Sequence, residues 1–292
     1  MKKVQSILVA VERSGDPKRV IGKAVVLARC FGARLELFLS NAESAYVQRH
    51  QYEAGALARA RESCIAASRE FLEQVWSSLA VHDVSVAMDA ACESPGYEGI
   101  VRKVQQASPD LVVRGMGEGS RGSGRALDAS DWELVRTCPA PLLLTRGKPW
   151  SKQPAVAAAI DIAGDETRTV TRSILRAAKR FAVDCKGSLD VIYAHRSDHP
   201  SPELIESDRA ALTERAQDAD VQPGEVFVVI GEPAAAIPRF AERHRYDLLV
   251  LGALTHRKAL TALVGTLTGR LIETLDSDIL LVKPPFYRSP VR

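Results

Sequence analysis

The sequence predicts two tandem α/β domains, each with a five-stranded, mostly parallel sheet that is covered by helices on both faces. Three observations support this prediction: a chain of 292 residues, an internal repeat, and apolar runs that alternate with amphipathic segments. A chain of this length suits two domains of about 150 residues each. Continuous apolar strands between helices are typical of parallel sheets buried on both faces, and right-handed crossovers then give a doubly wound sheet.

The repeat is visible first in the opening strand of each copy. Residues 7–12 (ILVAVE) align with residues 156–161 (VAAAID), at a shift of 149 positions. Later, residues 109–115 (PDLVVRG) align with 246–252 (YDLLVLG), at a shift of 137 that continues without a gap to the last strand of each copy. The first copy is therefore longer in its middle.

A short linker is expected between the two copies. Residues 147–154 contain one glycine and two prolines and show no hydrophobic periodicity. Such clusters of helix and strand breakers are typical of loops. We therefore expect one domain over 1–146 and a second over 153–292.

Within the second copy, strands and helices are expected to alternate along the whole length. The apolar runs predict strands at 155–160, 189–194, 226–230, 248–251 and 279–282. The amphipathic or polar segments between them predict helices at 166–182, 202–218, 233–244 and 266–275. The first copy follows the same order, with a long helix from about 52 to 79.

Composition excludes several functional classes. A net charge of +3 and 5% aromatic residues give neither a basic patch nor a stacking platform, so no nucleic-acid partner is expected. No apolar segment approaches the roughly 20 residues that span a bilayer, so no membrane span is expected. The cysteines are far apart and form no CxxC or Cys/His cluster, so we expect reduced, mostly buried thiols, no metal site and a cytoplasmic protein.

In a doubly wound sheet, ligands bind at the carboxyl ends of the strands, where the strand order reverses. Asp161 ends the first strand of the second copy, and Gly252 ends its fourth. A carboxylate at this place can accept hydrogen bonds from a ribose hydroxyl or a base amino group. A glycine lets the backbone approach a ligand closely because it has no Cβ.

A candidate anion site follows Gly252. Gly265 and Thr266 directly precede the apolar face of a helix, where unpaired backbone N–H groups and the helix dipole favour a phosphate. The local sequence is equally compatible with a helix that Thr266 merely caps. The basic residues 256–258 could reach a triphosphate or form a solvated loop.

Two other features leave alternatives open. Tyr193 and His195, at the end of the second strand, could flank an adenine or belong to the core. Residues 117–122 spell GxGxxG, the dinucleotide-binding pattern. This string follows the fourth strand, whereas the dinucleotide motif requires the turn after the first strand, so a flexible loop is the better interpretation.

The chain resembles a tandem-domain, E-type universal stress protein over nearly its whole length. Nucleotide-binding members of that family carry G-x-x-G, nine residues, then G-[S/T]. The second copy has Gly252, Thr255, Gly265 and Thr266 at those positions, so the spacing is intact and Thr255 replaces the second glycine. The resemblance implies flavodoxin-like domains of the adenine-nucleotide α-hydrolase type. It places Asp161 at the ribose and adenine, and Leu267 and Thr268 beside the phosphates.

The cofactor implied by this resemblance is ATP, with or without Mg²⁺. The implied binding residues are Ala159, Asp161, Ala194, Leu251, Gly252, Leu254, Thr255, Gly265, Thr266, Leu267 and Thr268. No catalytic residues stand out, because the chain shows no Ser-His-Asp, Cys-His or paired-carboxylate arrangement. Any ATP hydrolysis is therefore expected to be slow.

The first copy departs from the family pattern and resembles a degenerate domain. Gly115 is retained, but Glu118 stands where the second glycine belongs. Asp128 and Ala129 replace the Gly-Ser/Thr pair, and Glu12 replaces the family aspartate. Since carboxylates at the mouth of a phosphate site repel the ligand, this half is expected to be structural or to bind something else.

These features predict a stress-response regulatory protein that binds an adenine nucleotide in its second half. The alternative is a non-nucleotide ligand-binding or protein-interaction module in which both sites have lapsed. Single-domain members of the family pair through their last strands. In this chain, 142–144 could therefore pair with 279–282, which predicts an intramolecular pseudo-dimer that exists as a monomer or homodimer.

Overall fold

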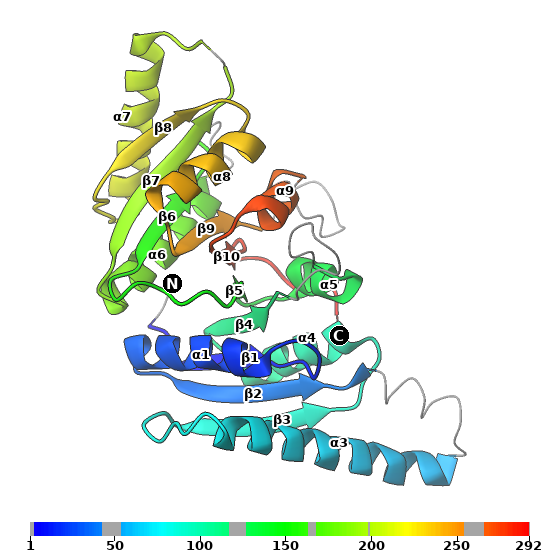
Figure 1. Cartoon of the computed structure of the whole chain (residues 1–292). Helices are drawn as coiled ribbons and strands as arrows, with labels where there is room; N and C mark the ends of the chain where they lie inside the picture. The colour runs from blue at the N-terminus through cyan, green and yellow to red at the C-terminus, as the bar shows by residue number, and fades with distance from the viewer. Residues whose placement is uncertain are drawn as a thin grey trace. The chain divides into compact units, whose positions relative to one another are not determined.

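The computed structural model describes residues 3–42, 54–116, 127–162, 168–197, 199–253 and 266–291 (Figure 1). These residues form two compact units. The N-terminal unit contains the described parts of Val4–Arg121 and Ala126–Gly147, together with Arg288–Val291. The C-terminal unit contains the described parts of Lys148–Tyr287.

Strands and helices alternate in the N-terminal unit, as the sequence predicts. In chain order they are β1 (Ser6–Ala10), α1 (Pro17–Phe31), β2 (Arg34–Ser40), α3 (Ala54–Ser77), β3 (Val86–Ala91), α4 (Gly96–Ala107), β4 (Leu111–Gly115), α5 (Ala129–Thr137) and β5 (Leu142–Thr145). The long helix expected from about 52 to 79 is α3.

The C-terminal unit repeats this order. Its elements are β6 (Ala155–Ala159), α6 (Arg168–Asp184), β7 (Ser188–His195), α7 (Pro202–Asp218), β8 (Val226–Ile230), α8 (Pro233–His244), β9 (Leu248–Gly252), α9 (Thr266–Thr274) and β10 (Asp278–Val282). These bounds lie close to those expected from the sequence, because each apolar run is flanked by breakers or polar residues.

Each unit contains a parallel sheet with the same strand order. The order is β3-β2-β1-β4-β5 in the N-terminal unit and β8-β7-β6-β9-β10 in the C-terminal unit. The direction of winding therefore reverses between the first and fourth strands of each unit, where a ligand site is expected. The predicted α/β fold class is confirmed.

Helices pack on the sheet of the C-terminal unit in two groups. Helix α6 packs on β6 and β9 and contacts α7, whereas α8 packs on β7 and β8 and contacts α9. The central strands are almost completely buried, as the continuous apolar runs of Val156–Ala158 and Leu248–Val250 require.

Local sequence signals explain where several helices begin and end. Asp16 caps α1 by accepting a hydrogen bond from the backbone N–H of Arg19 at 3.1 Å, and Pro17 occupies the first turn. Gly32 ends the same helix with a left-handed backbone at φ 64°. Ser201 and Pro202 start α7 in the same way.

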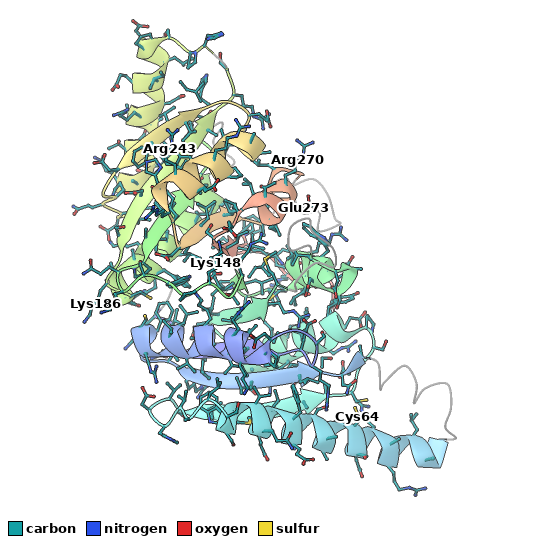
Figure 2. The ribbon with its side chains drawn as sticks, in the orientation of Figure 1. Cys64, Lys148, Lys186, Arg243, Arg270 and Glu273 are labelled. Carbon is teal, nitrogen blue, oxygen red and sulfur yellow. The ribbon has the colours of Figure 1, made fainter. Side chains whose placement is uncertain are left out.

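The five cysteines are all present as free thiols. Four are buried, and Cys30 is partly exposed; Figure 2 marks Cys64 on α3. This agrees with the expectation of reduced, mostly buried thiols. In the part of the chain that the structure describes, no helix is long and apolar enough to cross a membrane.

Candidate functional site

In the C-terminal unit, three strand ends meet where the candidate site residues lie. Strand β6 runs between β7 and β9, with Ala159 opposite Ile192 and Ala158 opposite Val250. The three strands are neighbours in the sheet (Figure 1). Their carboxyl ends therefore bring Asp161, Ala194 and Gly252 to one edge of the sheet. Ala194 and Leu251 are buried, and Ala159 is half-buried.

A hydrogen bond links the first turn of α9 to the end of β9. The Thr268 hydroxyl donates a hydrogen bond to the Gly252 carbonyl at 2.9 Å. Thr268 is buried, whereas the neighbouring Leu267 is half-buried. The contact places the N-terminal turn of α9 beside the strand end, and the N–H groups of such a turn can receive an anion. Thr268 therefore has a structural role in aligning the helix with the strand.

Asp161 lies just beyond β6 and is exposed. Its backbone carbonyl accepts a hydrogen bond from the Thr171 hydroxyl on α6 at 3.4 Å, which ties the loop to that helix. Burial raises the pKa of the Tyr193 phenol, and the negative charges of Asp208 and Asp161 raise it further. Asp161 and Tyr193 are thus electrostatic neighbours at the same edge of the sheet.

A histidine–aspartate pair ends β7. The His195 Nδ1 atom lies 2.7 Å from Asp208 Oδ2 on α7, and both side chains are largely buried. The Tyr193 and His195 rings meet edge to face at 6.3 Å between centroids. The pairing fixes the imidazole, because a buried ring nitrogen requires a partner. The sequence did not reveal Asp208, since no motif spacing links it to His195.

Several sequence-based predictions fall outside the described residues. These are the predictions for Leu254, Thr255, Gly265, the basic residues 256–258, Glu118 and the GxGxxG string at 117–122. The backbone of Thr266 begins α9, but its side chain is not among the described ones.

In the N-terminal unit, the corresponding strand ends are occupied by a buried ion-pair network. Arg114 lies in β4, and its Nε atom is 2.8 Å from Asp131 Oδ1. The guanidinium also contacts the Glu12 carboxylate. The guanidinium further donates to the Ala10 carbonyl at 3.4 Å. The side chains of Arg114 and Asp131 are only 5% and 6% exposed.

The residues of this network match the candidate site of the other unit position by position. By the two shifts of the repeat, Glu12 corresponds to Asp161, Arg114 to Leu251 and Asp131 to Thr268. The network therefore occupies positions that correspond to the candidate site of the C-terminal unit. The sequence signal for this network is the arginine inside the apolar run LVVRG, because a charged residue is rarely buried without a partner.

Burial governs the ionisation of the two carboxylates in the network. Removal from water raises the pKa of Glu12 and of Asp131, while the positive charge of Arg114 opposes this in both cases. Asp128, predicted to repel a phosphate, instead caps α5: its carboxylate accepts a hydrogen bond from the Asp131 backbone N–H at 2.7 Å.

The glycine retained at the end of the fourth strand has a packing role in both units. A Cβ on Gly115 would lie 2.4 Å from Val20 Cγ2, and a Cβ on Gly252 would lie 3.2 Å from Val170 Cγ1. Each valine belongs to the helix that follows the first strand of its unit. Helix packing alone therefore accounts for Gly115, so this glycine is no evidence for a ligand in the N-terminal unit.

Comparison with known proteins gives matches over the whole chain. The universal stress protein family matches residues 3–146 and again 155–283. Universal stress protein E of Salmonella typhi is 21% identical, covering 100% of this chain and 98% of the relative. The relative from Photorhabdus laumondii is 20% identical, with 100% and 99% covered.

Solved structures agree on the fold. A putative universal stress protein from Pseudomonas aeruginosa UCBPP-PA14 superposes with a TM-score of 0.73 at 23% identity, covering 97% of this chain and 94% of that one. A universal stress protein from Archaeoglobus fulgidus gives 0.71 at 12% identity, covering 97% and 100%. The identities are low, so these structures establish the fold of the chain and not its ligand.

Proposed function

The chain belongs to the universal stress protein family, and we propose that it is a stress-response regulator that binds ATP in its C-terminal unit. One observation carries the proposal. The strand ends of β6, β7 and β9 and the start of α9 converge there, and the positions that hold Arg114 and Asp131 in the other unit hold the uncharged Leu251 and Thr268.

The residues around this edge offer hydrogen-bonding groups of the kinds that the parts of an adenine nucleotide require. The exposed Asp161 carboxylate can accept hydrogen bonds from a ribose hydroxyl or the adenine amino group. The strand ends at Ala159, Ala194 and Leu251 offer backbone groups to the base. The backbone N–H groups around Gly265 and Thr266 precede α9 and suit the phosphates.

Hydrolysis of the bound nucleotide is expected to be slow. Phosphoryl transfer to water needs a group that orients the attacking water beside the phosphates. One described polar pair that could act in this way is His195, at the end of β7, with Asp208 on α7. Since β6 separates β7 from β9, this pair belongs to the side of the base. A Mg²⁺ ion, if it accompanies ATP, would be held mainly by the phosphate oxygens.

Titration of ATP into the full-length protein tests the proposal. Asp161→Ala removes the carboxylate, and Gly265→Val adds a side chain where the phosphates are proposed to bind. Both variants should lower ATP affinity by at least about tenfold, equivalent to about 1.4 kcal/mol. Glu206→Ala removes an exposed carboxylate on α7 and serves as the control that should bind like wild type.

Thr255 favours a second candidate function. It replaces a glycine of the nucleotide-binding pattern, and a Cβ there hinders close approach of the backbone to a phosphate. In that case the chain would bind another ligand or a protein partner. Equal, negligible ATP affinity in wild type, Asp161→Ala and Gly265→Val would favour this alternative, and mass spectrometry of molecules released from the purified protein would then identify the ligand.

We also propose that the chain is a monomer or homodimer. The sequence predicts that the last strands of the two copies pair within one chain, which would avoid the entropy cost of associating two separate chains. Size-exclusion chromatography with light scattering tests this directly. A stable assembly larger than a dimer would contradict it.

A further inference from the structure

Strand β8 is an apolar edge strand without the charged residues or prolines that usually prevent edge strands from pairing with other chains. It pairs with β7, and no other described strand pairs with its second edge. Its sequence, Val-Phe-Val-Val-Ile, contains no charge, proline or glycine. All five residues are half-buried or exposed, and Ile230 is 46% exposed. Exposed apolar edges of this kind pair readily with other chains, so proteins normally block them.

The matching strand of the N-terminal unit is blocked in this way. Strand β3 also lies at the edge of its described sheet, but it carries Asp89. The Asp89 carboxylate accepts a hydrogen bond from the Ala90 backbone N–H at 2.9 Å and pairs with Arg69 and Lys103 at 2.6 and 3.0 Å. The same position in the fold is therefore charged in one unit and left open in the other.

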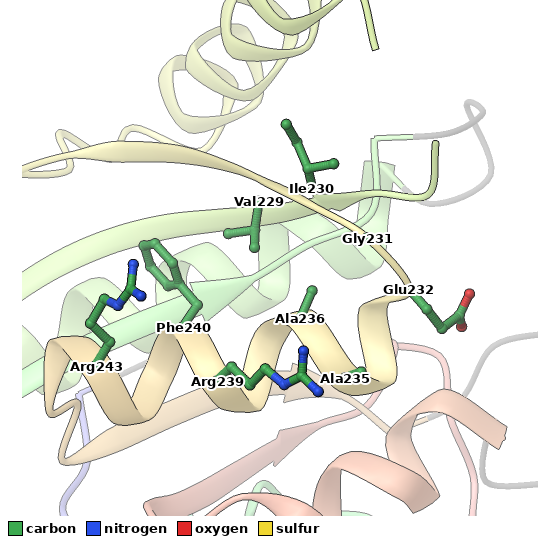
Figure 3. A pocket seen from close by; sticks show the side chains of 9 residues that line it. All are labelled: Val229, Ile230, Gly231, Glu232, Ala235, Ala236, Arg239, Phe240 and Arg243. Atoms are coloured by element: carbon green, nitrogen blue, oxygen red, sulfur yellow. The ribbon is translucent and has the colours of Figure 1, made fainter. Parts of the chain in front are cut away.

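A groove of about 410 Å³ lies along β8, between this strand and α8 (Figure 3). Val229 on the strand and Ala236 and Phe240 on the helix provide its apolar surface. The Phe240 ring is held in place by Phe227 at 4.9 Å and by stacking on His244 at 3.9 Å between ring centroids. The groove thus has a preformed apolar floor next to an open strand edge.

Two arginines give this groove a positive charge. Arg239 and Arg243 lie one turn apart on α8, both are exposed, and both line the groove (Figure 3). Neither guanidinium lies within ion-pair distance of a carboxylate among the residues that the structure describes. The one carboxylate of the lining, Glu232, precedes α8 at its other end. Arginine forks of this type favour carboxylate partners.

We propose that β8 and this groove form a docking site for an extended, acidic peptide segment of a partner protein. The segment would add as a strand to the open edge of β8, with backbone hydrogen bonds providing affinity. Its alternate side chains would lie over Val229 and Phe240 and direct carboxylates to Arg239 and Arg243. This proposal is independent of nucleotide binding.

Charge argues against a second copy of the chain as the occupant. The groove lining carries Arg239, Arg243 and one carboxylate, Glu232, so pairing of β8 with β8 of a second copy would bring together two linings that are each net positive. Like charges that are brought close together repel each other. An acidic segment satisfies both the strand edge and the arginines.

The test uses a fluorescein-labelled heptapeptide that alternates glutamate and valine, titrated into the full-length protein and followed by anisotropy. We expect saturable binding that weakens with added salt. Two matched control peptides test the mode of binding. One has lysine in place of glutamate, and the other has alternate backbone nitrogens methylated, which removes the N–H donors needed for strand pairing. Each should bind at least about tenfold more weakly. Equal binding of either peptide would overturn the proposal.

Variants of the protein locate the site. Arg239→Glu combined with Arg243→Glu should abolish binding of the glutamate peptide and allow the lysine peptide to bind. Arg209→Glu changes an exposed arginine on α7 and should have no effect. Hydrogen exchange should show new protection of the β8 amides when the glutamate peptide is bound.

Two results of the same experiments would contradict the proposal. If the β8 amides that point away from β7 are already protected in a dimer without peptide, the edge is occupied by a second copy. If inorganic phosphate displaces the peptide and methylation of the peptide has no effect, the arginines bind free anions and the strand edge is not used.

Discussion

The two units share a strand order and helix arrangement but differ at the edge of the sheet where a ligand is proposed to bind. In the N-terminal unit this edge is closed by Arg114, held between Glu12 and Asp131. In the C-terminal unit the same positions carry Asp161, Leu251 and Thr268. The sheet and the glycine at its fourth strand are retained in both, so the fold is preserved by packing requirements that do not depend on a ligand.

The closed edge is more than a loss of motif residues. The corresponding positions hold a buried guanidinium that donates charge-assisted hydrogen bonds to carboxylates of the protein itself. The proposed ligand site is therefore in the C-terminal unit. The comparison also predicts that the N-terminal unit depends for stability on groups that the other unit does not need.

The largest effect is expected from Arg114→Leu, which introduces the residue of the other unit. The change leaves Asp131 buried without its counter-charge, and loss of one partner of a buried ion pair costs about 3–5 kcal/mol. Urea unfolding of the full-length protein measures this loss. Arg29→Leu breaks the exposed pair with Asp83 in the same unit and should change stability far less.

Addition of Asp131→Thr to Arg114→Leu sharpens this test. The double variant removes the uncompensated carboxylate, so it should recover most of the stability that the single variant loses. A double variant as unstable as the sum of its single variants would show that Arg114 and Asp131 act separately.

The next effect concerns the shared glycine. A methyl group on Gly115 would meet Val20 Cγ2 at 2.4 Å, and valine is stiff at χ1, so Gly115→Ala should cost about 1–3 kcal/mol. The added methyl group of Gly252→Ala would lie farther from its neighbour, at 3.2 Å from Val170 Cγ1, so this substitution should destabilise the protein less. Thermal unfolding of the two variants gives the order, and a larger loss for Gly252→Ala would contradict the packing account.

A smaller effect is expected at the start of α9. Thr268→Val keeps the shape of the side chain and removes the hydrogen bond to the Gly252 carbonyl. The loss should be about 1 kcal/mol. If Thr268 also aligns α9 for the phosphates, ATP affinity should fall as well. An unchanged stability with lost affinity would instead place the hydroxyl in direct contact with the ligand.

The smallest effect is a pH dependence confined to the N-terminal unit. Burial raises the pKa of Glu12 in the folded state, so its contribution to stability is present below the ordinary glutamate pKa and is lost as pH rises through the raised value. As the pH rises from about 4 to about 7, the free energy of unfolding should therefore fall less in Glu12→Gln than in wild type. A stability difference that does not change with pH would contradict this.

Most of the fold was accessible from the sequence, because the repeat and the apolar runs are strong local signals. Strand β8 and helix α8 begin and end where the periodicity predicts, and Gly252 and Asp161 lie at the strand ends as expected. The chemistry of the N-terminal edge was predicted less completely. The degenerate phosphate motif of this unit stays a prediction, and the buried network around Arg114 was not anticipated from the sequence.

The missed features have a common physical reason. Asp131 reaches Arg114 from a different element, and Asp208 reaches His195 from α7, so neither pair has a fixed spacing along the chain. Such contacts depend on how helices pack against strands. Likewise, Gly115 matches a ligand motif by sequence, and only the contact with Val20 reveals its packing role.

The central claim is that one unit binds a nucleotide and the other is closed by its own side chains. The number of ATP molecules bound per chain at saturation tests it most directly, by native mass spectrometry or equilibrium dialysis of the full-length protein. The account predicts one ATP per chain, lost in Asp161→Ala. Two ATP molecules per chain would show that Arg114 does not close the N-terminal site, and none would show that the C-terminal unit does not bind ATP.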